Sequence, residues 1–128
     1  MVANTNSMSV LAADEGEKSL KVFHASALAS AVVFPVAVLA DSGGGVQALC
    51  NWTAAGLIPL HGYIGANWII SDYVPKASQN TVRGLTLAAS VLAFGGLVKL
   101  NVANDGIIDT VKHLFKPLEV EAAAEAAQ

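Results

Sequence analysis

The sequence predicts an all-α fold with three transmembrane helices followed by a short C-terminal amphipathic helix. Of the 128 residues, 54% are hydrophobic and only 13% are charged, whereas about a quarter of the residues in soluble domains are charged. Three long runs carry no formal charge apart from Lys99, and they place the spans at about residues 22–40, 46–71 and 84–103. Each run is close to the roughly 20 residues that cross a bilayer, and the runs are apolar nearly all round, unlike the one-sided helices of a soluble bundle.

The first 17 residues are polar and acidic and contain neither Lys nor Arg. A mitochondrial targeting segment would be basic and poor in acidic residues. We therefore interpret residues 1–17 as an extended, partly ordered tail, and a disordered terminus is the simplest alternative. The membrane region follows over residues 18–104.

The first span begins after two basic residues, Lys18 and Lys21, and His24 lies one turn further along the chain. Small residues in this span repeat at a spacing of four, which allows another helix to approach closely. These residues are Ala25, Ser26, Ala29 and Ser30.

The second span contains one imidazole, His61, far from its ends. An ionisable residue within a membrane is costly and is a functional candidate by default. Gly62 and Gly65 beside it fit either plain helix packing or clearance for a flat macrocycle, and Pro59 predicts a local kink. His61 itself is either a haem ligand or a hydrogen-bonding partner of a neighbouring helix.

Asp72 and Tyr73 follow where the second span ends, about 18 Å from His61 along a helix. Tyr73 is either an interfacial anchor or a hydrogen-bond donor to a quinone carbonyl. Asp72 is expected to pair with a basic residue of a partner or with Arg83, across a predicted loop at residues 72–83. Basic residues before the first span and in this loop place both on the inner face of the membrane.

The third span is rich in Gly and Ala and shows no visible chemistry. Beyond a predicted turn at Asn104, residues 107–115 alternate apolar and charged side chains, which predicts a short helix on the membrane surface. His113 on its polar side is expected to be solvated. Residues 105–128 thus form a surface helix and a tail that is either solvated or in contact with a neighbouring subunit.

The residue types limit the chemistry. The single cysteine, Cys50, cannot form an internal disulfide. The net charge of −3 argues against nucleic acid as a partner. A six-coordinate haem needs two axial ligands, and this chain offers one, so a haem at His61 would be shared with another polypeptide.

The pattern resembles the small membrane-anchor subunit of succinate dehydrogenase, the cytochrome b small subunit of respiratory complex II. It is carried by His61 in the second of three spans, with Asp72 and Tyr73 eleven and twelve residues later. The resemblance covers about residues 18–116 in architecture and about 60–75 in motif.

The resemblance implies that His61 is one axial ligand of a haem b and therefore a ligand of its iron, the other ligand coming from the large cytochrome b subunit. It implies that Tyr73 hydrogen-bonds ubiquinone near the iron–sulfur subunit and that Asp72 supports this site. His24 lies where family members carry an Arg near a haem propionate, so it is a candidate propionate contact. This Arg-to-His departure puts the salt bridge in doubt, and Pro59 is a second departure.

The implied function is that of a membrane-anchor subunit of succinate:ubiquinone oxidoreductase, with electrons arriving from the flavoprotein subunit. The implied location is the mitochondrial inner membrane, with the N-terminus on the matrix side, and a bacterial plasma membrane is the second choice. Two other classes stay open on the residues alone. One is a structural or assembly subunit without a redox centre, and the other is a small transporter with His61 as a proton relay.

Overall fold

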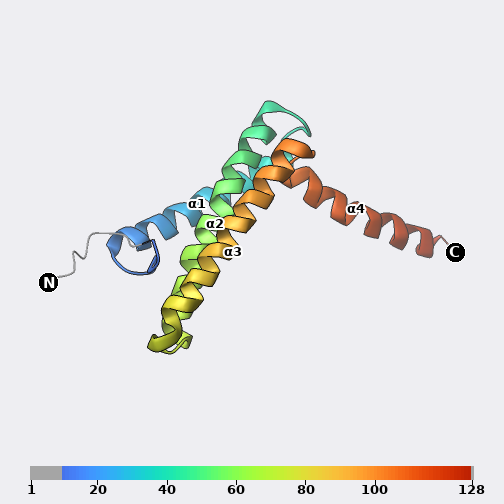
Figure 1. The fold of residues 1–128 in the computed structure, drawn as a ribbon. Helices are drawn as coiled ribbons and strands as arrows, with labels where there is room; N and C mark the ends of the chain where they lie inside the picture. Colours follow the sequence, from blue (N-terminus) through green and yellow to red (C-terminus); the bar gives the residue numbers. More distant parts are fainter. Residues whose placement is uncertain (1–9, 128) are drawn as a thin grey trace.

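The computed structural model describes residues 10–127, except for the side chains of residues 116–122. All regular structure in this part of the chain is α-helical, so the all-α prediction is confirmed (Figure 1). The four helices are α1 (Glu17–Leu39), α2 (Gly45–Tyr73), α3 (Lys76–Ala103) and α4 (Ile107–Ala126).

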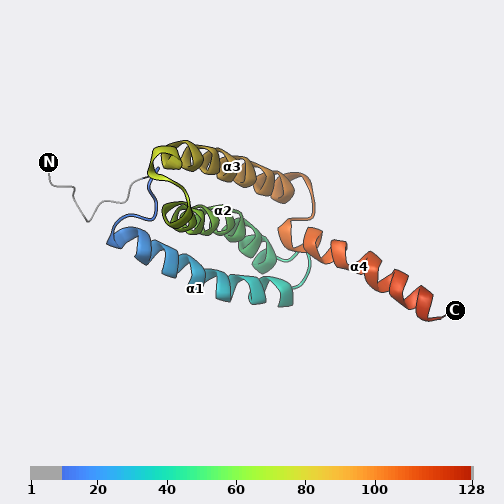
Figure 2. The ribbon, with the colours of Figure 1, turned by 90° about the horizontal axis from the view of Figure 1, so that it is seen from below.

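Helix α2 is the centre of the fold. It packs against α1 on one side and α3 on the other (Figure 2). The turns α1–α2 and α2–α3 are short and lie at opposite ends, so the three helices run alternately up and down. Helix α4 also contacts α2 and α3 at its start but then extends away from the bundle in both views (Figures 1 and 2).

By length and hydropathy, two of the described helices could cross a membrane, α1 and α3. Helix α2 is also long enough, at 29 residues, but its polar side chains lower its mean hydropathy. Several of them are buried rather than exposed, which is how polar groups in bilayer-spanning helices are usually accommodated. These are Gln47, Asn51 and Asn67.

The predicted loop at residues 72–83 is wrong, because α3 already begins at Lys76 and the connection is a tight turn at Val74 and Pro75. The amide of Val74 closes α2 by donating to the carbonyl of Ile70, and the carbonyl of Pro75 accepts from the amide of Ser78. Proline is common just beyond helix ends because it cannot continue the helix. Pro35 and Pro59, by contrast, lie inside continuous helices.

The segment Val10–Gly16 is fastened to the bundle. The Tyr63 hydroxyl donates to the carbonyl of Val10 at 2.6 Å, and Ala13 is buried against Tyr63 and Ile64. Glu17 is already helical. Residues 10–17 of the predicted tail are thus ordered against the bundle, and residues 1–9 lie outside the described part of the chain.

The opposite end of the bundle is tied together by amide side chains. Asn51 Oδ1 accepts from the amide of Ile108 at 3.1 Å, and Asn101 Nδ2 donates to the carbonyl of Asn51 at 2.9 Å. Gly106, with φ of 95°, turns the chain into α4 directly against the Asn51 side chain. Helix α4 continues to Ala126, so it is longer than the predicted short helix.

Candidate functional site

His61 lies on the face of α2 that packs against α1, and it is half-buried. Its Nδ1 is 2.9 Å from the Oγ of Ser26 on α1. The Ser26 hydroxyl is itself a donor to the carbonyl of Phe23 at 2.8 Å. A serine hydroxyl has one hydrogen, so Ser26 donates either to the Phe23 carbonyl or to Nδ1, and the tautomer of His61 depends on which of the two it serves.

Phe23 fixes the plane of the His61 ring. The two rings are stacked, with centroids 4.4 Å apart and an interplanar angle of 14°. A methyl group at Gly65 would lie 3.4 Å from the Phe23 ring. This is ordinary van der Waals contact, so a side chain at position 65 would meet the Phe23 ring without overlap. At Gly62 an added Cβ would meet no atom within 4 Å, so packing within the chain does not require a glycine there.

The donor set fits one axial position of a haem. A neutral imidazole binds iron through a ring nitrogen, and the other nitrogen normally donates to a fixed acceptor. His61 has this arrangement, because Nδ1 is held by Ser26 and Nε2 makes no hydrogen bond with the described residues. Among these residues no group of three metal-ligating side chains occurs.

His24 is exposed on α1, next to the phenylalanine that covers His61. Its ring centroid is 6.1 Å from that of Phe23, in a tilted arrangement. His24 therefore lies beside Phe23 on α1, but its side chain is exposed and does not contact His61.

Asp72 and Tyr73 are both exposed at the end of α2. Tyr73 is 83% exposed, so the described residues supply no pocket wall around its phenol. The expected alternative of an Asp72–Arg83 pair is wrong. Arg83 instead forms an ion pair with Asp14 at 2.7 Å and donates to Ser71 Oγ at 2.7 Å.

Asp14, Ser71 and Arg83 form a closed cluster, since Ser71 also donates to the second carboxylate oxygen of Asp14. The Arg83 side chain is only 4% exposed. This cluster joins the N-terminal segment to α2 and α3. Its residue on α2, Ser71, directly precedes Asp72. It fixes the helix end from which Asp72 and Tyr73 project.

Sequence reasoning treated Ser26 only as a small residue and did not use Phe23 or Asp14. The spacing of Phe23 and Ser26, three residues apart, is the available signal, because it places both on one helix face. Which residue of α2 meets that face depends on the register between two helices, and the sequence does not specify that register.

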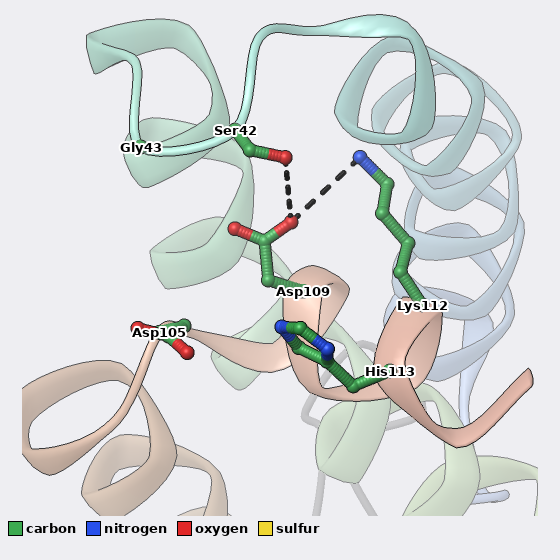
Figure 3. Close-up of a pocket in the computed structure, with 6 residues that line it drawn as sticks. All are labelled: Ser42, Gly43, Asp105, Asp109, Lys112 and His113. Carbon is green, nitrogen blue, oxygen red and sulfur yellow. Dashed lines mark hydrogen bonds and ion pairs between the residues drawn. The ribbon is translucent and has the colours of Figure 1, made fainter. Parts of the chain in front are cut away.

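A polar pocket of about 420 Å³ lies at the opposite end of the bundle (Figure 3). Asp109, at the start of α4, accepts from Ser42 Oγ at 2.9 Å and from Gln47 Nε2 at 3.1 Å, and lies 3.8 Å from the Lys112 ammonium. Its carboxylate is thus committed to joining α4 to the α1–α2 turn. His113 lines this pocket, and its side chain is exposed, which agrees with the expectation that it is solvated.

The chain was compared with known proteins. The family model of the succinate dehydrogenase cytochrome b small subunit matches residues 2–116. The mitochondrial succinate dehydrogenase [ubiquinone] cytochrome b small subunit of Pongo abelii is 36% identical over 67 residues. That alignment covers 52% of this chain and 42% of the relative, so the similar region is less than half of the relative's length. No solved structure matches. Since the family model covers most of the chain, the protein belongs to the family of succinate dehydrogenase cytochrome b small subunits.

Proposed function

We propose that this chain is a membrane-anchor subunit of succinate:ubiquinone oxidoreductase that supplies one haem b ligand and part of the ubiquinone site. The observation that carries the proposal is the setting of His61, whose Nδ1 is hydrogen-bonded to Ser26 while Nε2 makes no hydrogen bond with the described residues. This imidazole lies in the centre of a long, mostly apolar helix in a chain of the matching family.

The anchor role requires three membrane-spanning helices, and we propose that α2 spans the membrane together with α1 and α3. Helix α2 has no Asp, Glu, Lys or Arg before Asp72, and it lies between α1 and α3, which qualify by hydropathy. Large apolar side chains of the bundle are exposed, for example Leu28 at 70% and Leu92 at 77%. Lipid or partner helices would cover these surfaces.

Helix α4 fits a position at the membrane surface. Its apolar side chains Val111, Leu114 and Phe115 are 44%, 67% and 62% exposed, and Lys112 is close to them on the helix. An amphipathic helix of this kind lies in the plane of the interface. Membrane lipid is therefore a proposed partner of α4 as well as of the three spans.

His61 would hold the iron of a haem b through Nε2, with the other axial ligand coming from the large cytochrome b anchor subunit. A bound haem supplies a one-electron store beside the route to the quinone. His24 would reach a haem propionate, because it is exposed and adjacent to the residue that stacks on His61.

Tyr73 would donate its phenolic hydrogen to a carbonyl oxygen of ubiquinone and stabilise the charge that develops there on reduction. Its exposure means that partner subunits, above all the iron–sulfur subunit, would form the rest of the pocket. Asp72 would pair with a basic residue of the neighbouring anchor, since Arg83 is already committed to Asp14. Electrons would reach this site from the flavoprotein subunit.

We place the N-terminus on the matrix side of the mitochondrial inner membrane. The α1 start and the α2–α3 turn share one end of the bundle, and Lys18, Lys21, Lys76 and Arg83 lie there. This end would face the positive-inside compartment. Lys99 and Lys112 on the other side oppose the assignment, and the similarity to a mitochondrial protein supports it.

A second candidate is a structural or assembly subunit without a redox centre. The Ser26–His61 hydrogen bond favours this candidate, because a half-buried histidine can join two helices without binding a metal. In that case Tyr73 would be an interfacial anchor. The two candidates differ in whether the complex contains a b-type haem.

The deciding experiment is a reduced-minus-oxidised visible spectrum of the intact complex purified through this chain, with bound flavin assayed in parallel. A b-type signal together with flavin is expected. Flavin without haem would retain the anchor role and reassign His61 to helix packing. The absence of both would exclude the complex II assignment and favour the structural subunit.

A further inference from the structure

We propose that Ser26 is a positioning residue that sets the tautomer and the electron-donating strength of His61 toward the haem iron. This inference rests on the proposed function, because it assigns a task to Ser26 only if His61 binds iron. Ser26 is 4% exposed and lies on α1, 35 residues before His61.

The direction of the hydrogen bonds carries the proposal. Ser26 Oγ donates to the carbonyl of Phe23 at 2.8 Å and is 2.9 Å from His61 Nδ1. We assign its one hydrogen to the first bond, so that in the second bond Ser26 accepts the hydrogen of Nδ1. The ring is then neutral with its lone pair on Nε2, which is the form that binds a metal through Nε2.

Helix α1 also restricts the ring through a second contact. Phe23 stacks on one face of the imidazole at 4.4 Å between centroids, so the ring cannot rotate about χ2 without losing this contact. Ser26 holds the ring edge from one turn further along the same helix face. A 180° flip would turn Nδ1 away from Ser26 and break the hydrogen bond.

The hydrogen bond should also tune the iron. A proton acceptor on Nδ1 makes the imidazole a better electron donor, which stabilises the oxidised metal. Removing the acceptor should therefore shift the haem midpoint potential to more positive values. It should also weaken haem binding by about 10- to 100-fold, as is typical when an outer partner of a metal ligand is lost.

Ser30 provides a matched control. Its hydroxyl donates to the carbonyl of Ser26 at 2.8 Å, one turn along α1. Ser30→Ala thus removes the same atom from the same helix and leaves the His61 hydrogen bond in place. A purely structural effect of losing a serine hydroxyl would be shared by Ser26→Ala and Ser30→Ala.

The test is an optical redox titration of the intact complex carrying Ser26→Ala, Ser30→Ala or His61→Ala, with haem and flavin content measured in each. We expect loss of haem in His61→Ala, a positive shift of the midpoint potential in Ser26→Ala, and a wild-type potential in Ser30→Ala. A wild-type potential in Ser26→Ala, or an equal shift in both serine variants, would overturn the role of Ser26.

Two further outcomes distinguish failure of the proposed function from failure of the Ser26 assignment. Retention of the haem signal in His61→Ala would overturn the proposed function itself, together with the Ser26 assignment. If Ser26→Ala loses haem completely, Ser26→Thr decides, since it keeps the hydroxyl oxygen. Haem at wild-type potential in Ser26→Thr supports the proposal, and loss of haem there contradicts it.

Discussion

The guanidinium group of Arg83 on α3 forms a buried ion pair with the carboxylate of Asp14, at 2.7 Å between Nη1 and Oδ1. The two side chains are 4% and 9% exposed, and Ser71 on α2 bonds to both of them. This pair fastens the N-terminal segment across the end of α2 and α3. It also removes Arg83 from the set of charges available to Asp72.

We predict that Asp14→Ala destabilises the protein by about 3–5 kcal/mol, because it leaves the Arg83 charge buried and unpaired. The exposed Glu17–Lys21 pair on α1 is the control, and Glu17→Ala there should cost only about 0.3–0.5 kcal/mol. Thermal denaturation of the detergent-solubilised complex checks both. Equal effects of the two substitutions would show that the Asp14–Arg83 pair is not buried in the assembled protein.

The helical content of the chain could be predicted because long uncharged apolar runs are typical of membrane-spanning helices. Hydropathy does not mark where a helix ends, so residues 76–83 resemble a loop in the sequence. They are polar and lie outside the apolar run, yet their backbone continues α3. Similarly, Gln47, Asn51 and Asn67 lower the hydropathy of α2 although the fold buries them.

The separation of His61 and Tyr73 could be predicted from the sequence, since both lie on one helix. The partners of His61 and Arg83 could not. Ser26 is 35 residues from His61, and Asp14 is 69 residues from Arg83. Such contacts depend on helix register and on how the N-terminal segment folds back, and neither leaves a local pattern.

Tyr73→Phe should lower ubiquinone reduction by about 10- to 100-fold, the effect of losing a hydrogen bond to a charged acceptor. Succinate oxidation with an artificial acceptor should be unchanged, because that assay bypasses the quinone site. Trp52→Phe is the control, since Trp52 is an exposed aromatic residue in the first turns of α2, far from Tyr73. A parallel loss of both activities in Tyr73→Phe would count against a quinone contact.

Gly106→Ala should loosen the junction between α3 and α4. Gly106 has a φ of 95°, and an added Cβ would overlap the Asn51 side-chain amide. Gly43, with a φ of 77° and no atom within 4 Å of an added Cβ, would suffer backbone strain alone. Gly106→Ala should therefore be the more destabilising by about 1–3 kcal/mol, the usual cost of overpacking. Thermal denaturation of the two variants tests this difference, and equal stability losses would contradict it.

His61→Ala should abolish or strongly weaken haem binding while the three long helices and the bound flavin are retained. The reason is that no other described residue pairs a fixed Nδ1 with a free Nε2, since His24 and His113 are exposed and make no hydrogen bond through a ring nitrogen. His113→Ala, at the far end of the bundle, is the matched control and should leave the Soret band unchanged. Absorption spectra of the purified complexes, normalised to flavin, make the comparison. An undiminished Soret band in His61→Ala would remove His61 as the ligand and return it to a packing role against Ser26 and Phe23.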